Sequence, residues 1–172
     1  MEIAGQVEIV LLSSEHEKSE FDCGDDALNL FLRKFANQNQ KKGLNVTYVA
    51  VRSGTTKVLG FYCISNGQIA HNKLPENEAR KLPFYPIPVA RIGRLATSLD
   101  AREQGIGALL LIDALKKVLN ASNKIGIFAV EVDAKSNEVK RFYERYGFSE
   151  LTDNSLHLYL SMATVRKLFR PK

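Results

Sequence analysis

The sequence predicts a mixed α/β fold built around one sheet. In the first half, short apolar runs separated by turn residues are typical of antiparallel strands. In the second half, strand and helix patterns alternate. A chain of 172 residues that is 45% hydrophobic and 25% charged is long enough for one globular domain and short for two. We therefore expect a single domain over residues 1–172.

The first half predicts one strand, one helix and a hairpin. Val7–Leu12 favours a short strand, and Asp25–Gln40 favours a helix because acidic residues stand at its start and Gly43 follows its end. Val46–Arg52 and Val58–Ser65 flank a turn and predict two antiparallel strands. The apolar stripe expected on the helix consists of Ala27, Leu28, Phe31, Leu32 and Phe35.

The second half begins with a polar segment, Ile69–Pro86, in which prolines allow one helical turn near Glu76–Arg80. A basic tail is expected from Arg166 onward. Between them we expect a strand over Pro88–Ser98, a helix over Gly105–Asn120, a strand over Ile125–Val132, a helix over Ser136–Tyr146 that Gly147 ends, and a strand over Leu156–Ser161.

The charge is distributed unevenly along the chain. The net charge is +5, but residues 1–26 carry eight acidic residues and one basic residue, a balance of −7. The rest of the chain therefore carries +12. Such a charge attracts nucleic acid, phosphorylated cofactors or an acidic partner protein, although it also suits a merely solvated surface.

Several classes of protein do not fit the sequence. No apolar run approaches the ~18 residues of a membrane span, and no secretory signal pattern opens the chain, so we expect a cytoplasmic protein without membrane contact. Cys23 and Cys63 fit reduced, buried thiols. His16, His71 and His157 are scattered without metal-ligand spacing, so no metal site is expected.

A glycine turn stands where the Pro88–Ser98 strand gives way to a helix. Its pattern, Arg102-x-x-Gly105-x-Gly107, presents unpaired backbone N–H groups at the positive end of a helix dipole, which binds phosphate oxygens. The same pattern also serves plain capping and tight packing. A P-loop is excluded because GxxxxGK[ST] is missing, and a dinucleotide fingerprint would need its glycines after a first parallel strand.

The turn resembles the acetyl-CoA pyrophosphate loop of the GNAT N-acetyltransferase superfamily, and the later Phe142-Tyr143-x-x-Tyr146-Gly147-Phe148 resembles that family's tyrosine helix. The resemblance implies a GNAT (acyl-CoA N-acyltransferase) fold, with a central mixed, mostly antiparallel sheet flanked by helices, and acetyl-CoA as co-substrate. The residues it assigns to cofactor binding are Leu95, Ala96, Thr97, Arg102, Glu103, Gln104, Gly105, Ile106, Gly107, Ser136, Asn137 and Phe142.

A narrower resemblance is to the GNAT toxins of bacterial toxin–antitoxin pairs. It is carried by Phe21-Asp22-Cys23-Gly24 and by Pro86-Ile87-Pro88-Val89, which four intervening residues separate from Arg94-Leu95-Ala96. It implies acetylation of the free α-amine of aminoacyl-tRNA, a ribbon-helix-helix antitoxin as partner, and a homodimer. Two positions depart from the pattern: Glu103 stands where glycine is common, and Gln104 where lysine or arginine is common.

The resemblance assigns catalysis to Tyr143, which would give its phenolic proton to the departing thiolate; core packing is the alternative, and Tyr146 lies one turn away. An α-amine, with a pKa of ~7.7–8.0, is substantially neutral near pH 7–8 and needs little help from a protein base. No Asp, Glu or His lies between Pro86 and Leu99, while Glu131 and Asp133 remain candidates for a water-mediated base.

Basic residues near these motifs are candidates for contact with tRNA phosphates. Each of them also fits an ordinary charged residue of the solvated surface. Two rival functions remain: an acetyltransferase acting on a protein or small-molecule amine, and a coenzyme-sensing or nucleic-acid-binding module without turnover. The candidate tRNA-binding residues are Arg91, Arg94, Lys140, Arg141 and Arg145.

Overall fold

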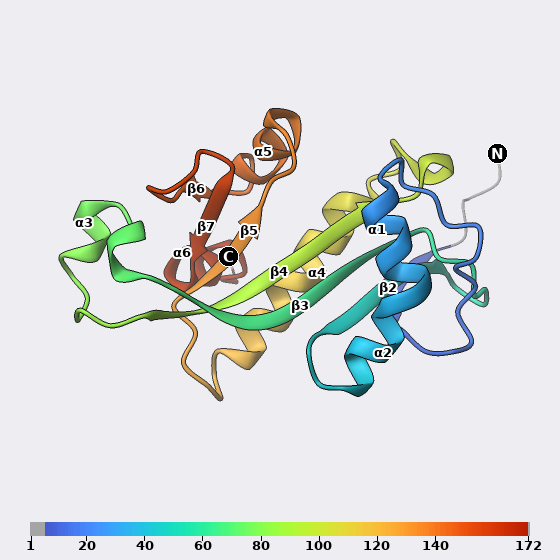
Figure 1. The fold of residues 1–172 in the computed structure, drawn as a ribbon, viewed down its shortest axis with the longest axis horizontal. Coiled ribbons are helices and arrows are strands. Elements are labelled where there is room, and N and C mark those ends of the chain that lie inside the picture. The colour runs from blue at the N-terminus through green and yellow to red at the C-terminus, as the bar shows by residue number, and fades with distance from the viewer. Residues whose placement is uncertain (1–5, 172) are drawn as a thin grey trace. The chain divides into compact units, whose positions relative to one another are not determined.

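The computed structural model describes residues 6–171, and its seven strands form one mixed sheet in the order β1-β2-β3-β4-β5-β7-β6 (Figure 1). Strand β4 pairs in parallel with β5, whereas β1–β2, β2–β3, β5–β7 and β6–β7 are antiparallel. The predicted fold class is confirmed. The strands are β1 (Val7–Leu11), β2 (Val46–Arg52), β3 (Gly60–Ile69), β4 (Ile87–Thr97), β5 (Ala129–Asp133), β6 (Ser149–Glu150) and β7 (His157–Ser161).

The helices follow the predicted order, with one addition at the C-terminus. Short 3-10 turns cover His71–Lys73 and Leu99–Ala101, and a π-helical turn covers Phe31–Phe35. The α-helices are α1 (Asp26–Leu30), α2 (Ala36–Lys41), α3 (Glu76–Ala79), α4 (Ile106–Ala121), α5 (Asn137–Glu144) and α6 (Met162–Leu168).

The chain forms two compact units. Unit 1 runs up to Ser65 and includes Gly93–Ala114, and unit 2 combines Asn66–Ile92 with the chain from Leu115 onward. Strands β3 and β4 and helix α4 each pass from one unit into the other. The expectation of one domain over residues 1–172 stays a prediction.

Helix α1 of unit 1 begins as its acidic start predicts. The Asp25 carboxylate accepts a hydrogen bond from the Leu28 amide at 3.1 Å and so caps the helix. Asn29 is buried in the first turn, where its Oδ1 accepts from the Cys23 amide at 2.9 Å. Ala27 is exposed instead, so its assignment to the apolar stripe is wrong.

The π-helical turn changes which side of the next helix is buried. Phe31 and Leu32 lie in the core as expected, but Phe35 is 45% exposed and Ala36 takes the buried position. A π turn closes with an i→i+5 bond, so it shifts the following residues around the helix axis by about one position. The prediction that Phe35 packs in the core is therefore wrong.

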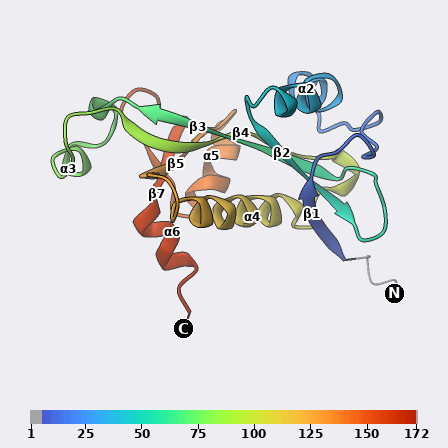
Figure 2. The ribbon, with the colours of Figure 1, turned by 90° about the horizontal axis from the view of Figure 1, so that it is seen from below.

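Strand β3 separates two packing layers within unit 1. Phe61 faces the helices α1 and α2, with its ring centroid 5.6 Å from Phe21 and 6.1 Å from Phe31. The neighbouring Gly60 faces α4, where an added Cβ would lie 3.0 Å from a Leu110 methyl carbon. Figure 2 shows α2 and α4 on opposite sides of these strands. The alternation along β3 gives unit 1 one helical layer on each face of its strands.

Unit 2 is built on the parallel pair β4–β5 and the antiparallel pair β5–β7. The β5–β7 pair runs from Ala129↔Ser161 to Asp133↔His157, and Val165 of the following helix α6 is fully buried. Helix α6 lies where a basic tail was expected, because Met162 and Val165 recur at helical spacing among the charges. The Ser161 hydroxyl starts it by accepting from the Thr164 amide at 3.2 Å.

Strand β5 is shorter than predicted. It begins at Ala129, and Ile125 of the preceding segment is 58% exposed. An apolar run therefore overstated the strand by four residues, because Ile125 and Gly126 belong to the turn after α4. The short strand β6 was not predicted.

Other class predictions concern thiols, membranes and metals. Cys23 and Cys63 are buried and free, and burial raises the pKa of both thiols, which keeps them protonated and unreactive. Within residues 6–171 no helix is long and apolar enough to cross a membrane. In the same part of the chain, no cluster of three or more His, Cys, Asp or Glu side chains is arranged to hold a metal.

Candidate active site

The predicted glycine turn leads into α4 and is exposed to solvent. Arg102 ends a 3-10 turn in extended conformation, Glu103 has φ 64°, and Gly105 has φ 75° immediately before the helix begins at Ile106. An added Cβ on Gly105 would meet no atom within 4 Å, and residues Arg102–Gly105 are exposed. The turn therefore leaves its backbone accessible from outside.

The first amides of α4 are free of helical partners. The first bond of the helix runs from the Leu109 amide to the Gly105 carbonyl at 3.1 Å. The amides of Ile106, Gly107 and Ala108 come before it, so the helix itself supplies them with no acceptor. They stand at the positive end of a 16-residue helix, a site suited to phosphate oxygens.

Side chains on both sides brace this turn. Arg102 donates to the Cys23 carbonyl at 3.3 Å, and the Gln104 side-chain oxygen accepts from Arg52 at 2.7 Å. Asp100 accepts from the Ser98 hydroxyl at 2.5 Å and from Lys57 at 2.9 Å. The Ser98 hydrogen bond and then Lys57 lower the pKa of Asp100, so this brace is ionised at neutral pH. The turn is held in shape before any ligand arrives.

Tyr143 lies in an aromatic cluster of unit 2. It is 5% exposed, and its ring centroid lies 5.2 Å from Phe142 and 5.3 Å from Phe148. Burial raises the pKa of its phenol, which therefore keeps its proton well above neutral pH. Tyr146, the alternative donor, is half-buried beside Phe142 at 5.5 Å. Tyr143 is thus the more deeply buried phenol of the two.

Of the other residues expected near the coenzyme at α5, Ser136 and Phe142 have structural partners. The Ser136 hydroxyl caps α5 by accepting from the Val139 amide at 3.2 Å. Asn137 is the first helical residue and is exposed, and Phe142 supports the Tyr143 ring. Capping leaves the Ser136 hydroxyl proton free to donate, because the hydrogen bond uses only its oxygen.

Strand β4 continues beyond its parallel partner. The register with β5 runs over four pairs, from Val89↔Ala129 to Ile92↔Val132, whereas β4 extends to Thr97. Ala96 is buried, and Leu95 and Thr97 are half-buried. The end of β4 leads through the Leu99–Ala101 turn directly to the glycine turn.

The two candidate bases are both engaged with Arg91. Its guanidinium donates to Glu131 at 2.8 Å and to Asp133 at 2.5 Å. The second oxygen of Glu131, which is 3% exposed, lies 2.5 Å from His157 Nε2, and Asp153 lies 3.1 Å from the other ring nitrogen. Arg91 therefore stabilises a buried carboxylate, and His157 has a structural partner that spacing did not reveal.

The sequence model of the acetyltransferase (GNAT) domain family matches residues 79–167, a little over half of the chain. The chain belongs to the GNAT acetyltransferases. A tRNA-acetylating toxin of Mycobacterium tuberculosis is 33% identical over 157 residues, which cover 91% of this chain and 93% of that protein.

Two solved structures resemble this GNAT acetyltransferase closely. AtaT in complex with acetyl-methionyl-tRNAfMet has a TM-score of 0.89 and 29% identity, covering 95% of this chain and 99% of that one. A tyrosine-to-phenylalanine mutant of the AtaT toxin, bound to the C-terminus of the antitoxin AtaR and to acetyl-CoA, has a TM-score of 0.80 and 26% identity, covering 96% and 99%. Both likenesses extend over nearly the whole length of each chain.

The basic residues predicted to contact tRNA differ in their exposure and in their side-chain partners. Arg94 of this GNAT chain lies with its guanidinium carbon 3.7 Å from the centroid of the Phe31 ring. Lys140 forms an ion pair with Glu150, and its side chain is only 14% exposed. Arg141 of α5 and Arg145, the residue that follows this helix, are exposed. These two cations are thus accessible, whereas Lys140 is paired with Glu150.

Proposed function

We propose that this chain transfers the acetyl group of acetyl-CoA to the α-amine of aminoacyl-tRNA and acts as a translation-blocking toxin. One observation carries the proposal: the same chain holds an exposed, braced glycine turn at a helix start and a buried, protonated tyrosine on a later helix. The similarity to the tRNA-acetylating toxin of Mycobacterium tuberculosis and to AtaT in complex with acetyl-methionyl-tRNAfMet supports the choice of substrate.

The residues present fit acetyl-CoA. The amides of Ile106, Gly107 and Ala108 would bind the pyrophosphate, and the open space beside Gly105 leaves room for it. Backbone groups of β4 over Leu95–Thr97 would pair with the pantetheine arm. Arg102, Glu103, Gln104, Ser136, Asn137 and Phe142 complete the proposed cofactor site. When bound, the coenzyme supplies an acetyl thioester.

Tyr143 would act as the general acid. Its phenol would donate a proton to the leaving sulfur as the acetyl group passes to the amine, and would regain a proton from solvent before the next turnover. The acceptor amine loses its own proton to solvent, which its pKa of about 8 permits without a dedicated base. Glu131 is poorly suited to that task because Arg91 and His157 already bind both of its oxygens.

Partners follow from the same proposal. Arg94, Arg141 and Arg145 would contact tRNA phosphates, whereas Arg91 and Lys140 would act through the carboxylates they hold in place. The toxin would be cytoplasmic and homodimeric, and a ribbon-helix-helix antitoxin would restrain it. The antitoxin-bound AtaT structure supports an antitoxin of some kind.

The test is incubation of the protein with labelled acetyl-CoA and total charged tRNA, followed by separation of the aminoacyl species. We expect label on the α-amine of one or more aminoacyl-tRNAs and none on uncharged tRNA. Label confined to protein or to free amines would refute the proposed substrate while leaving acetyltransferase activity intact.

A further inference from the structure

Two exposed aromatic rings lie outside the site described above. Phe84 is 83% exposed and Tyr85 is 70% exposed, and both belong to the proline-flanked segment between α3 and β4. Water contact with so much ring surface is unfavourable, and two adjacent rings in a polar loop are typical of a binding surface. Prolines at 83 and 86 restrict the backbone that carries them.

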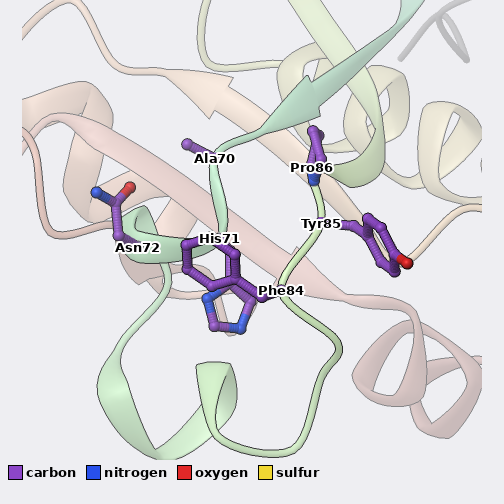
Figure 3. A pocket seen from close by; sticks show the side chains of 6 residues that line it. All are labelled: Ala70, His71, Asn72, Phe84, Tyr85 and Pro86. Atoms are coloured by element: carbon purple, nitrogen blue, oxygen red, sulfur yellow. The ribbon is translucent and has the colours of Figure 1, made fainter.

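These rings border a hollow of about 270 Å³ within unit 2 (Figure 3). Cavities that bind drug-sized ligands begin at about 300 Å³, so this one suits a smaller group such as a single base. Figure 3 shows Phe84 beside the His71 ring and Tyr85 directed away from that pair. The lining residues are Ala70, His71, Asn72, Phe84, Tyr85 and Pro86.

The polar side of the hollow is held in a fixed orientation. His71 Nε2 lies 2.7 Å from the Ala79 carbonyl, and because a carbonyl only accepts, Nε2 carries the proton. In a neutral imidazole, Nδ1 is then the acceptor. The carbonyl of Asn72 accepts from the Thr152 hydroxyl at 3.1 Å, which ties this turn to the segment after β6. The exposed Asn72 amide adds donors and an acceptor.

We propose that this hollow binds an unpaired base from the single-stranded 3′ end of the tRNA. The inference rests on the tRNA substrate proposed above. The base would stack on the exposed face of Phe84, and His71 Nδ1 would accept from its exocyclic amino group. Aromatic rings bind unpaired bases in this way because every base has a stacking face.

Charge and composition favour a nucleic acid over a protein partner here. Arg80 and Lys81 are exposed just ahead of the aromatic pair and can reach phosphates beside a stacked base. The flanking Asn72, Arg80 and Lys81 are exposed polar or cationic groups, which suit the phosphates and base edges of a nucleic acid. A second copy of this chain is the alternative occupant, and the experiment distinguishes it.

The experiment measures binding of the full-length protein to two RNAs at fixed salt: intact tRNA, and the same tRNA trimmed of its unpaired 3′ nucleotides. We expect Phe84→Ala to weaken binding of intact tRNA by about 10- to 100-fold and to leave binding of trimmed tRNA unchanged. Phe84→Tyr should keep the affinity of the wild type. Phe35→Ala, which removes an exposed ring of unit 1, is the matched control and should bind both RNAs like the wild type.

Three results would overturn the stacking site. If Phe84→Ala and Tyr85→Ala both bound intact tRNA as tightly as the wild type does, neither ring would contribute to recognition. Equal losses on both RNAs would place the contact of Phe84 on a part of the tRNA other than its unpaired 3′ nucleotides. A change from dimer to monomer in light scattering, caused by Phe84→Ala, would assign the rings to a contact between copies. Because binding needs no turnover, wild-type protein that prefers intact tRNA but acetylates none would refute the proposed function alone.

Discussion

The environment of Tyr143 determines how the reaction should depend on pH. Its phenol has a raised pKa because burial disfavours the phenolate, so it remains a proton donor throughout pH 6–9. We expect the rate at saturating substrates to rise with pH as the α-amine loses its proton, to level off near pH 8–9, and to show no alkaline fall due to this phenol. The measurement is a pH profile of kcat. A fall beginning near pH 8 would contradict it.

The same shift makes a prediction about stability. The pKa of the Tyr143 phenol is higher in the folded state than its unfolded value of ~10. The contribution of the protonated phenol to the free energy of unfolding is therefore fully present below about pH 10, and it is lost as the pH rises through the folded-state pKa. Urea unfolding of the wild type should therefore show declining stability above pH 10. Tyr143→Phe, which lacks the titrating group, should decline less steeply over that range.

Glu103 adds backbone strain and a negative charge to the turn proposed to bind pyrophosphate. Its φ of 64° is unfavourable for a residue with a side chain and costs about 1 kcal/mol, and its carboxylate belongs to a turn proposed to bind pyrophosphate. Glu103→Gly should tighten acetyl-CoA binding several-fold in calorimetry by removing the carboxylate charge. The strain is present in the free protein too, so its removal should raise the free energy of unfolding and leave the affinity unchanged. Glu103→Gln removes the charge alone and should give a similar gain in affinity. Weaker binding by both variants would contradict this account of the turn.

Among the secondary-structure elements, β3, the end of β4 and the start of α4 meet at Gly60. A Cβ added there would lie 2.9 Å from the Ala96 carbonyl and 3.2 Å from Ile106. Gly60→Ala should therefore destabilise the protein by about 1–3 kcal/mol in urea unfolding. Gly93→Ala is the matched control in β4, because its Cβ would meet nothing within 4 Å, and it should change stability by less than about 0.5 kcal/mol.

Element order was predictable from periodicity and turn residues, and most bounds agree within two residues. The errors have local causes. The π turn that moves Ala36 inward leaves no mark on an apolar pattern. Helix α6 was hidden because its basic residues dominate the composition of the tail, although Met162 and Val165 carry its buried side.

The candidate site was predictable in part, since the glycine turn and Tyr143 belong to contiguous motifs. Pairings between distant residues were not, and the Arg91–Glu131–His157 cluster joins three different strands. The sequence did offer a signal for the aromatic hollow: two adjacent rings between prolines in a polar segment. That signal identifies exposed rings but not the His71 hydrogen bond that orients the hollow.

For the molecule as a whole, the charge of +12 after residue 26 favours a polyanionic substrate. With about three phosphate contacts, tRNA affinity should fall roughly 40-fold between 50 and 200 mM salt. Acetylation of a small α-amine by the same protein should change little over that range. Initial rates at subsaturating tRNA give the measurement. Equal salt dependence for both acceptors would count against tRNA as the substrate.

The most direct test of the account compares wild-type protein with Tyr143→Phe in acetyl transfer to charged tRNA, with acetyl-CoA affinity measured in parallel. The phenylalanine ring keeps the packing against Phe142 and Phe148 and removes only the proton donor. We predict a fall in kcat of about 10²- to 10⁴-fold with acetyl-CoA affinity within about twofold of the wild type. An unchanged kcat would contradict the account.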